Sequence, residues 1–427
     1  MSWAWAEHES VSGTCVNLVR SDALSLLTAD YVLELLAEAT PLGAIALLTC
    51  ILTTSISLLW LSPSPVAAQT SQSDATPTEL RGIWLTNIDS DVLFSKAKLA
   101  AGIARLKRMN FNTIYPTVLN GGYTLYPSNV AEAVIGTALD PEPGLQNRDM
   151  LAEAIAEGHR QGLAVIPWLE FGLMLPGESS IAKTHPDWIA QRADGSEVWL
   201  EGGRIERRWL SPFHPQVRQF LTAIVAEIAA NYDVDGIQFD DHLGLPVDFG
   251  YDDYTVKLYQ SEHSGKRPPT DHTDPGWVRW RANKISNLTA QLFHTVKALK
   301  PDCVFSLSPN PQEFAYATYL QDWSRWENLG YVEELIVQVY RSDLPRFVSE
   351  LRHPTVQRAR GHVPTGIGIL AGLKGRDVPM KQIVEQVETV RKEGLGGVSL
   401  FFYETLGNRD RQFTQLFAKP ARRRPKP

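Results

Sequence analysis

Cysteine is scarce in this sequence, which contains only Cys15, Cys50 and Cys303 among 427 residues. No two of them stand in a Cys-X-X-Cys spacing, which excludes a disulfide framework and a cysteine-rich zinc site. The sequence also lacks a His-X-X-X-His pair, and no Gly-X-Gly-X-X-Gly follows any strand-like run. We therefore expect neither a metal ion nor a dinucleotide cofactor.

Positive charge is also sparse, and no basic stripe occurs before the extreme C-terminus. The formal net charge is −7, so the charge pattern gives no reason to expect a nucleic acid as partner. The basic run from Arg422 to Lys426 lies in the segment 419–427, which we expect to be a disordered, solvated tail.

One long apolar run is present, from Leu42 to Leu61, and it is long enough to cross a hydrocarbon layer of roughly 30 Å. Small residues at Val66 and Ala68 then satisfy the small-X-small pattern of a cleavage site. We interpret 42–68 as a signal or anchor segment, although acidic rather than basic residues precede it, and 1–41 as an extension of unassigned role. This predicts an exported protein, periplasmic or membrane-anchored, that faces the cell envelope.

After a polar linker at 69–78, strand-like apolar runs alternate with longer amphipathic segments over residues 79–418. Such alternation is typical of βαβ units and a parallel sheet. The strand-like runs are Arg81–Thr86, Thr113–Val118, Ala164–Leu169, Gly236–Phe239, Val304–Ser308, Leu335–Val339, Gly366–Leu370 and Val398–Phe402. They predict an α/β fold of the TIM-barrel type, a (β/α)8 barrel, with the long insertions 171–211 and 242–275 over its C-terminal face.

The fourth run ends in two adjacent carboxylates. Side chains alternate along a strand, so Gln238 and Asp240 share one side, and Ile237 and Phe239 the other. The apolar pair suits the covering helices, which leaves Gln238 and Asp240 facing the barrel interior. Asp241 has the opposite alternation, and it either lies on the rim or turns inward where the strand ends.

The same alternation places polar or aromatic residues at the interior ends of most strands. These residues are Trp84, Tyr115, Trp168, Glu170, Gln238, Asp240, Asn310, Gln338 and Tyr340. At the eighth strand the alternation does not choose between Tyr403 and Glu404. Aromatic faces and hydrogen-bonding groups arranged in a ring are what a sugar site needs, so we expect the aromatic and amide members to contact a polysaccharide.

Carboxyl groups in such a ring suggest cleavage of a glycosidic bond, which uses one acid and one base or nucleophile. Asp240 is the preferred acid/base, and Asp241, Glu170 and Glu404 compete for the partner role. Asp240, Asp241 and His242 also offer metal ligands. Adjacent residues on a strand point apart, however, so we do not predict a metal site.

Several motifs together resemble the glycosyl-hydrolase-like family ten, whose members are exported bacterial proteins, several of them acting on or linked to peptidoglycan glycan strands. The motifs are Glu79–Thr86, Leu125–Ser128, Pro215–Arg218, Tyr232–Asp241, Trp277–Arg281, Ser306–Pro309, Val337–Tyr340 and Gly397–Leu406. The resemblance spans nearly all of residues 79–410 and implies the barrel fold. It also implies that the family's acidic pair falls on Asp240 and Asp241.

The resemblance further places the family's Gln and Tyr of strand six on Gln338 and Tyr340, and the Arg of its Trp-Arg pair on Arg281. We expect Arg281 to bind an acidic sugar substituent, although a solvated helix face is the alternative. The sequence departs from the family pattern at Glu170, where Asn is expected. It departs again at Leu119, where Arg is expected after Val, and this second change bears on substrate identity.

We interpret the chain as a glycoside hydrolase that acts on a cell-envelope polysaccharide, with peptidoglycan glycan strands as the leading substrate. Two alternatives stay open at this point. One is a glycan-binding barrel without catalysis, and the other is a metal-dependent polysaccharide deacetylase. They differ in product, since the hydrolase creates new reducing ends, the binding protein creates none and the deacetylase releases acetate.

Overall fold

The computed structural model describes residues 76–424, which belong to one compact unit. The segments 1–41 and 42–68, together with most of the linker, lie outside the described residues. None of the helices between residues 76 and 424 is both long and apolar enough to cross a membrane.

The centre of the fold is a parallel sheet of nine strands in the order β5-β2-β1-β16-β13-β12-β11-β10-β6. Their bounds are β1 Leu80–Leu85, β2 Thr113–Pro116, β5 Ala164–Val165, β6 Trp168–Leu169, β10 Gly236–Asp240, β11 Val304–Ser308, β12 Glu334–Gln338, β13 Thr365–Leu370 and β16 Gly397–Phe401. Each of the eight predicted runs forms strand, and the ninth arises because the third run is divided in two.

The third predicted run is divided into β5 and β6, which form the two ends of the sheet. The sheet is therefore curled, with both of its ends in one short stretch of chain. Pro167 has no N–H to donate to a ladder, and it separates β5 from β6. On one side the Ile166 N–H donates to Ile114 at 3.0 Å, and on the other the Gln238 N–H donates to the Pro167 carbonyl at 2.9 Å. β5 therefore pairs with β2 at one end of the sheet, and β6 pairs with β10 at the other end, as in a barrel.

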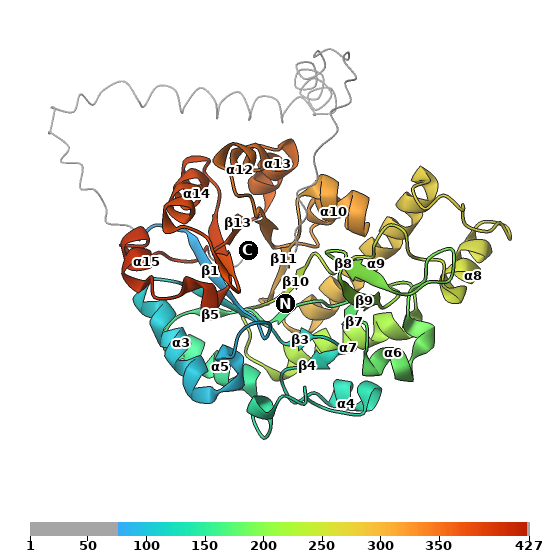
Figure 1. Cartoon of the computed structure of the whole chain (residues 1–427), viewed down its shortest axis with the longest axis horizontal. Helices are drawn as coiled ribbons and strands as arrows, with labels where there is room; N and C mark the ends of the chain where they lie inside the picture. The colour runs from blue at the N-terminus through green and yellow to red at the C-terminus, as the bar shows by residue number, and fades with distance from the viewer. Residues whose placement is uncertain (1–75, 425–427) are drawn as a thin grey trace, which may run out of the picture. The chain divides into compact units, whose positions relative to one another are not determined.

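Helices surround this sheet (Figure 1). Their bounds are α3 Lys96–Arg108, α4 Asn129–Ile135, α5 Met150–Arg160, α6 Ser180–Thr184, α7 Pro215–Asn231, α8 Asp253–Glu262, α9 Pro275–Leu299, α10 Gln312–Tyr319, α11 Trp323–Asn328, α12 Leu344–Leu351, α13 Pro354–His362, α14 Met380–Lys392 and α15 Asp410–Leu416. The longer amphipathic segments predicted between the strands form helices, among them α3, α5, α7, α9 and α14. In α7, for example, Pro215 opens the helix, and Val217, Leu221, Ile224 and Ile228 are buried along one face.

Short strands occupy the connections. They are β3 Leu119–Asn120, β4 Tyr123–Thr124, β7 Met174–Pro176, β8 Trp199–Glu201, β9 Ile205–Trp209, β14 Gly372–Leu373 and β15 Arg376–Asp377. The antiparallel sheet β7-β9-β8 comes from the insertion predicted after the third strand.

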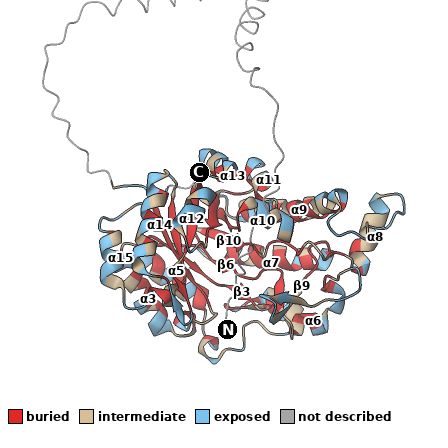
Figure 2. Cartoon of the chain, turned by 45° about the horizontal axis from the view of Figure 1, so that its top comes forward, coloured by how far each residue is buried: buried red, intermediate tan, exposed pale blue. Residues whose placement is uncertain are grey.

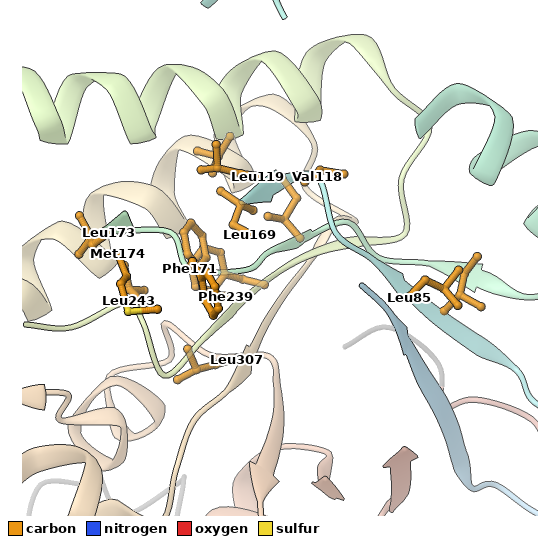
Figure 3. Close-up of a cluster of buried hydrophobic side chains, with 14 of the residues drawn as sticks. Leu85, Val118, Leu119, Leu169, Phe171, Leu173, Met174, Phe239, Leu243 and Leu307 are labelled. Carbon is orange, nitrogen blue, oxygen red and sulfur yellow. The ribbon is translucent and has the colours of Figure 1, made fainter. Parts of the chain in front are cut away.

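The core lies between the sheet and its helices. Buried residues fill the strands and the inner sides of the helices, while the outer sides are exposed (Figure 2). Ile237 and Phe239 are fully buried in this layer, as the alternation predicted. Figure 3 shows Phe239 next to Phe171, with Leu169 and Leu307 nearby. The apolar side of β10 is therefore anchored, which turns Gln238 and Asp240 to the opposite side.

The basic tail was predicted to be disordered, but it is ordered as far as Arg424. Arg422 forms a parallel bridge with Thr78, and Arg423 forms an ion pair with Glu334 at 2.6 Å, with 17% of the arginine side chain exposed. Buried carboxylates need such partners, and local sequence gives no sign of a contact made so far along the chain. Residues 425–427 lie outside the described range.

A second arginine cluster lies at the same amino end of the strands. Glu79 accepts hydrogen bonds from Arg81 and Arg391, each at 2.7 Å. Burial alone would raise the pKa of Glu79, but the hydrogen bonds and charges of Arg391 and Arg81 hold it below its ordinary value. Arg81 also stacks on Phe417, 4.8 Å from the ring centre.

Candidate active site at the carboxyl ends of the strands

Asp240 is the last residue of β10, and both of its carboxyl oxygens accept hydrogen bonds. Oδ1 accepts from the backbone N–H of His242 at 2.9 Å and pairs with the His242 ring Nδ1 at 3.0 Å. Oδ2 accepts from the indole N–H of Trp168 at 3.1 Å. Only 2% of Asp240 is exposed. Hydrogen bonds therefore satisfy both oxygens of this buried side chain.

Asp241 also reaches the site, because the strand ends at Asp240 and the chain turns there. Its Oδ2 accepts from the Asn310 amide at 2.8 Å, and its Oδ1 accepts from the Gln338 amide at 3.1 Å. Burial raises the pKa of Asp241 to about 6; the charge of His242 opposes this rise and the charge of Asp240 adds to it. The strand-five and strand-six amides predicted at the interior thus hold Asp241.

His242 lies between the two aspartates and an aromatic wall. Burial lowers its pKa, but the charges of Asp240 and Asp241 outweigh that effect and raise the value to about 9. The ring meets the edge of Phe171 at a centroid distance of 4.6 Å and lies 5.9 Å from the ring of Trp209. The sequence analysis considered His242 only as a possible metal ligand, so its role as the cation beside the two aspartates was missed.

Glu170 follows β6 and is held by two hydroxyl groups. Its Oε2 accepts from Thr86 at 2.8 Å and from Thr117 at 2.7 Å, and 1% of the residue is exposed. Burial raises the pKa of Glu170 to about 7, against the two threonine hydrogen bonds and with a further rise from the charge of Asp240. A carboxyl group with this pKa is protonated over much of the neutral range.

Tyr340 links these groups into one site. Burial raises the pKa of its hydroxyl well above the ordinary value, and the charges of Asp241, Asp240 and Glu170 raise it further. Three carboxyl groups close enough to act on one tyrosine therefore converge at the carboxyl ends of β6 and β10, next to Tyr340.

Glu404 and Tyr403 are not part of this group. Glu404 accepts a hydrogen bond from Ser90 at 2.5 Å, and its pKa is raised by burial and by the charge of Asp91 rather than by the strand-four acids. The ring of Tyr403 lies beneath the guanidinium of Arg105 on α3, at 5.3 Å. The eighth strand therefore presents neither residue to Asp240.

Arg281 also lies elsewhere, in a structural position. Its guanidinium donates to the backbone carbonyls of Val247, Phe249 and His272, stacks on Trp277 and is fully buried. These contacts fasten the loop after β10 to α9, and burial lowers the pKa of Arg281 to about 10. The guanidinium is therefore used by backbone groups, and neither predicted role, substrate contact or solvated face, describes it.

Trp84, Gln238 and Tyr115 form a hydrogen-bonded column through the barrel interior. The Trp84 indole N–H donates to Gln238 at 2.7 Å, and the Gln238 amide donates to Ser306 at 2.9 Å. Ser306 and Tyr115 both donate to Glu334, at 2.9 and 3.0 Å. Trp84 lies at the carboxyl-end side of this column, whereas Tyr115 points to the amino end, opposite the acids.

Asp240, Asp241 and His242 offer ligand atoms that lie within 4.8 Å of one another. His242 Nδ1 is already paired with Asp240 Oδ1, and the histidine carries positive charge at neutral pH because its pKa is about 9. A metal ligand must be the neutral imidazole. The residues fit a charged hydrogen-bonded group better than a metal-binding set.

The insertion after the third strand covers the site. Trp209 at the end of β9 lies beside His242, and the rings of Trp199 and Tyr319 follow at 6.1 and 5.9 Å from Trp209. Phe314, 6.0 Å from Tyr319, is 40% exposed. Aromatic rings thus extend from the acids toward solvent, a lining suited to the C–H faces of sugars.

Comparison with known proteins agrees with this geometry. Residues 79–389 match the family described as Glycosyl hydrolase-like 10. Glycosyl hydrolase DigH of Escherichia coli strain K12 is 25% identical over 351 residues, covering 70% of this chain and 74% of that protein. Glycosyl hydrolase YngK of Bacillus subtilis strain 168 is 26% identical over 259 residues, covering 56% and 46%.

Among solved structures, the glycoside hydrolase domain of PgaB (BpsB) from Bordetella bronchiseptica superposes with a TM-score of 0.60 at 17% identity. The match covers 81% of this chain and all of that one. The family match spans well over half of the chain. The chain therefore belongs to the glycosyl hydrolase-like 10 family of glycosidase-type enzymes.

Proposed function

We propose that the protein hydrolyses glycosidic bonds in a cell-envelope polysaccharide, and that peptidoglycan glycan strands are its substrate. The observation that supports this is the pairing of carboxyl groups in opposite surroundings at one site. Burial raises the pKa of Glu170 to about 7 in spite of its two hydroxyl donors, whereas Asp240 is surrounded by N–H donors and a histidinium. Environments that separate two carboxyl groups in this way assign an acid and an ionised partner.

In this mechanism Glu170 donates its proton to the glycosidic oxygen as the bond to the anomeric carbon breaks. Asp240, whose two oxygens are held by N–H donors, faces the positive charge that develops on the sugar ring and stabilises it. Water then adds its hydroxyl group to the anomeric carbon, which forms the new reducing end, and gives its other proton back to Glu170. The sequence analysis took Asp240 as the acid/base; the proposal gives the proton to Glu170 because its pKa, about 7, keeps the acid form available.

Asp241 and His242 set the charge of the site. Asp241 is fixed by Asn310 and Gln338, and His242 bridges the two aspartates, 3.0 Å from Asp240 and 3.7 Å from Asp241. The histidinium lets two adjacent carboxylates occupy one buried turn. Aromatic rings extend from the buried Trp209 beside it through Tyr319 to the exposed Phe314, whose face is open to the polymer.

We also propose that the protein works outside the cytoplasm, either released or attached through the segment 42–68. The apolar run and the small-X-small pattern of the sequence support this location. Such a location would give the enzyme access to envelope glycans.

The test is incubation of the full-length protein with peptide-stripped glycan strands, with new reducing ends detected by mass spectrometry. Asp240→Asn should lower the rate by on the order of a thousandfold, since an essential carboxylate is neutralised. Asp253→Asn, an exposed change in the first turn of α8, is the matched control and should cleave like wild type. Full activity in Asp240→Asn would refute the assignment. Binding without cleavage by any variant would favour a glycan-binding barrel, and release of acetate would favour a deacetylase.

A further inference from the structure

A groove of ≈ 610 Å³ lies on the outer side of the barrel, lined by α7, α8 and α9. Its volume is typical of ligand sites. None of the carboxyl groups of the candidate active site lines it, so it is a separate feature of the molecule.

The groove is hollow because α7 presents short side chains where it runs beside α9. Thr222 and Ala223 lie one helical turn before Ala226 on this stripe, and none of the three is long enough to fill the space to the neighbouring helix. Asn287 and Gln291, also one turn apart, line the side formed by α9. The groove is therefore formed by the packing of three helices and not by a loop.

Arg218 supplies the charge of the groove. Its Nη2 donates to the Gln291 amide oxygen at 2.7 Å, and the Gln291 amide in turn donates to Thr222 at 2.9 Å. No aspartate or glutamate lines the groove, and between residues 76 and 424 Arg218 has no carboxylate partner, its bonds going to an amide and a backbone carbonyl. Lys284, the other cation here, is paired with Glu262. Arg218 is half-buried and its orientation is fixed by these bonds.

The remaining lining suits a sugar chain. Tyr254 contributes partly exposed aromatic surface at the α8 side, and Asn287 is an exposed amide on the opposite side. Aromatic faces pack on pyranose rings, and amides and hydroxyls bind sugar hydroxyls. An arginine fork without a carboxylate partner adds recognition of a carboxylate.

We propose that this groove is a second, non-catalytic binding site for a carboxylate-bearing glycan chain. Arg218 binds the sugar carboxylate, the amides of Gln291 and Asn287 bind hydroxyl groups, and Tyr254 packs on a ring. The site goes beyond the proposed function and depends on that function only for the choice of probe. A surface anchor of this kind would keep a long polymer on the enzyme between cleavage events.

The test is titration calorimetry of the full-length protein carrying Asp240→Asn, so that the ligand is not cut. The probe is peptide-stripped glycan strands with free lactyl carboxylates, compared with the same strands after amidation. Arg218→Ala should weaken binding of the free-acid strands about tenfold, the usual size of a charged hydrogen-bonding contact. The matched control is Arg346→Ala on α12, where 67% of the side chain is exposed, and it should bind like the parent.

Asn287→Asp provides a second variant, because the residue is exposed and the change cannot empty the core. It places a negative charge in the groove and should weaken binding of free-acid strands while sparing amidated ones. Equal binding of free-acid and amidated strands, or unaltered binding in both groove variants, would overturn the proposal. Competition by sodium acetate without any binding of strands would reduce the groove to a simple anion site and would also overturn it.

Hydrolysis is measured separately with the wild-type protein, so the two proposals fail independently. Binding that depends on Arg218 without hydrolysis by wild type would refute the proposed function and leave the groove intact. Hydrolysis without binding that depends on Arg218 would do the reverse.

Discussion

Buried acids occur at both ends of this barrel, but their partners differ. At the amino ends of the strands, Glu79 is bonded to two arginines and Glu334 to Arg423. At the carboxyl ends, Glu170 receives hydrogen bonds from threonine hydroxyls, and Asp241 from amides. Full charges thus compensate Glu79 and Glu334, whereas neutral dipoles hold Glu170, and Asp241 has His242 beside its amide donors.

The difference separates stability from function. A buried carboxylate with arginine partners stays ionised and is costly to disturb. A buried carboxyl group with neutral donors keeps a raised pKa, a state that contributes little to folding but suits proton transfer. Substitutions at the two ends should therefore change different measured quantities.

The largest effect is expected for Glu170→Gln at the carboxyl end. Loss of the proton donor should lower kcat on glycan strands by about 10²- to 10⁴-fold, while the thermal unfolding midpoint at acidic pH, where Glu170 is protonated, changes little because glutamine still accepts from both threonines. Steady-state rates and calorimetric unfolding of the same preparation check this. A large loss of stability with kcat unchanged would make Glu170 a structural residue.

Glu79→Gln should do the opposite at the amino end. Breaking this buried cluster should lower the free energy of unfolding by about 3–5 kcal/mol, while the activity per folded molecule stays near that of wild type. Denaturant unfolding measures the loss. Glu388→Gln, an exposed change on the same helix as Arg391, is the control, and similar losses in both variants would remove the distinction.

The pH dependence of stability should have opposite signs at the two ends. The pKa of Glu170 is raised from 4.5 to about 7, so its stabilising effect is complete below pH 4.5 and is lost as the pH rises through about 7. The pKa of Glu79 is lowered, so its effect is present above pH 4.5 and is lost as the pH falls. Melting curves of wild type, Glu170→Gln and Glu79→Gln from pH 3 to pH 8 give the two difference profiles. Parallel slopes would contradict the comparison.

The smallest effect is expected for Glu404→Gln. This acid is bonded to Ser90 and does not meet Asp240, so the rate on glycan strands should change by less than about twofold. The measurement is the same reducing-end assay. A loss comparable to that of Glu170→Gln would place the second carboxyl group on the eighth strand after all.

Much of the fold follows from local pattern. Apolar runs predicted each strand of the barrel, and helical spacing predicted the helices between them. The alternation of side chains placed Trp168, Asn310 and Gln338 in the interior, where they contact the acids. These predictions succeed because a strand has a fixed period and one face must be buried. The break in the third run was not predicted, although Pro167, which cannot donate to a ladder, marks it in the sequence.

The rest depends on contacts that alternation does not describe. Asp241 reaches the site because the chain turns where β10 ends. Glu404, which follows β16, is bonded to Ser90 instead and lies outside the site. Arg281 and Arg423 bind groups brought close only by the folded chain, namely backbone carbonyls of the β10 loop and the carboxylate of Glu334. Backbone carbonyls carry no sequence signature, so the partners of a buried arginine appear only in three dimensions.

The bridge between Thr78 and Arg422 has a consequence for engineering. The backbone N–H of Arg422 donates to Pro77 at 2.9 Å and that of Glu79 donates to Arg422 at 3.0 Å, so the chain enters and leaves the barrel at one point, at the end away from the acids. A short linker there would join the two ends, and new ends opened in an exposed surface loop would give a circular permutant with its catalytic face undisturbed.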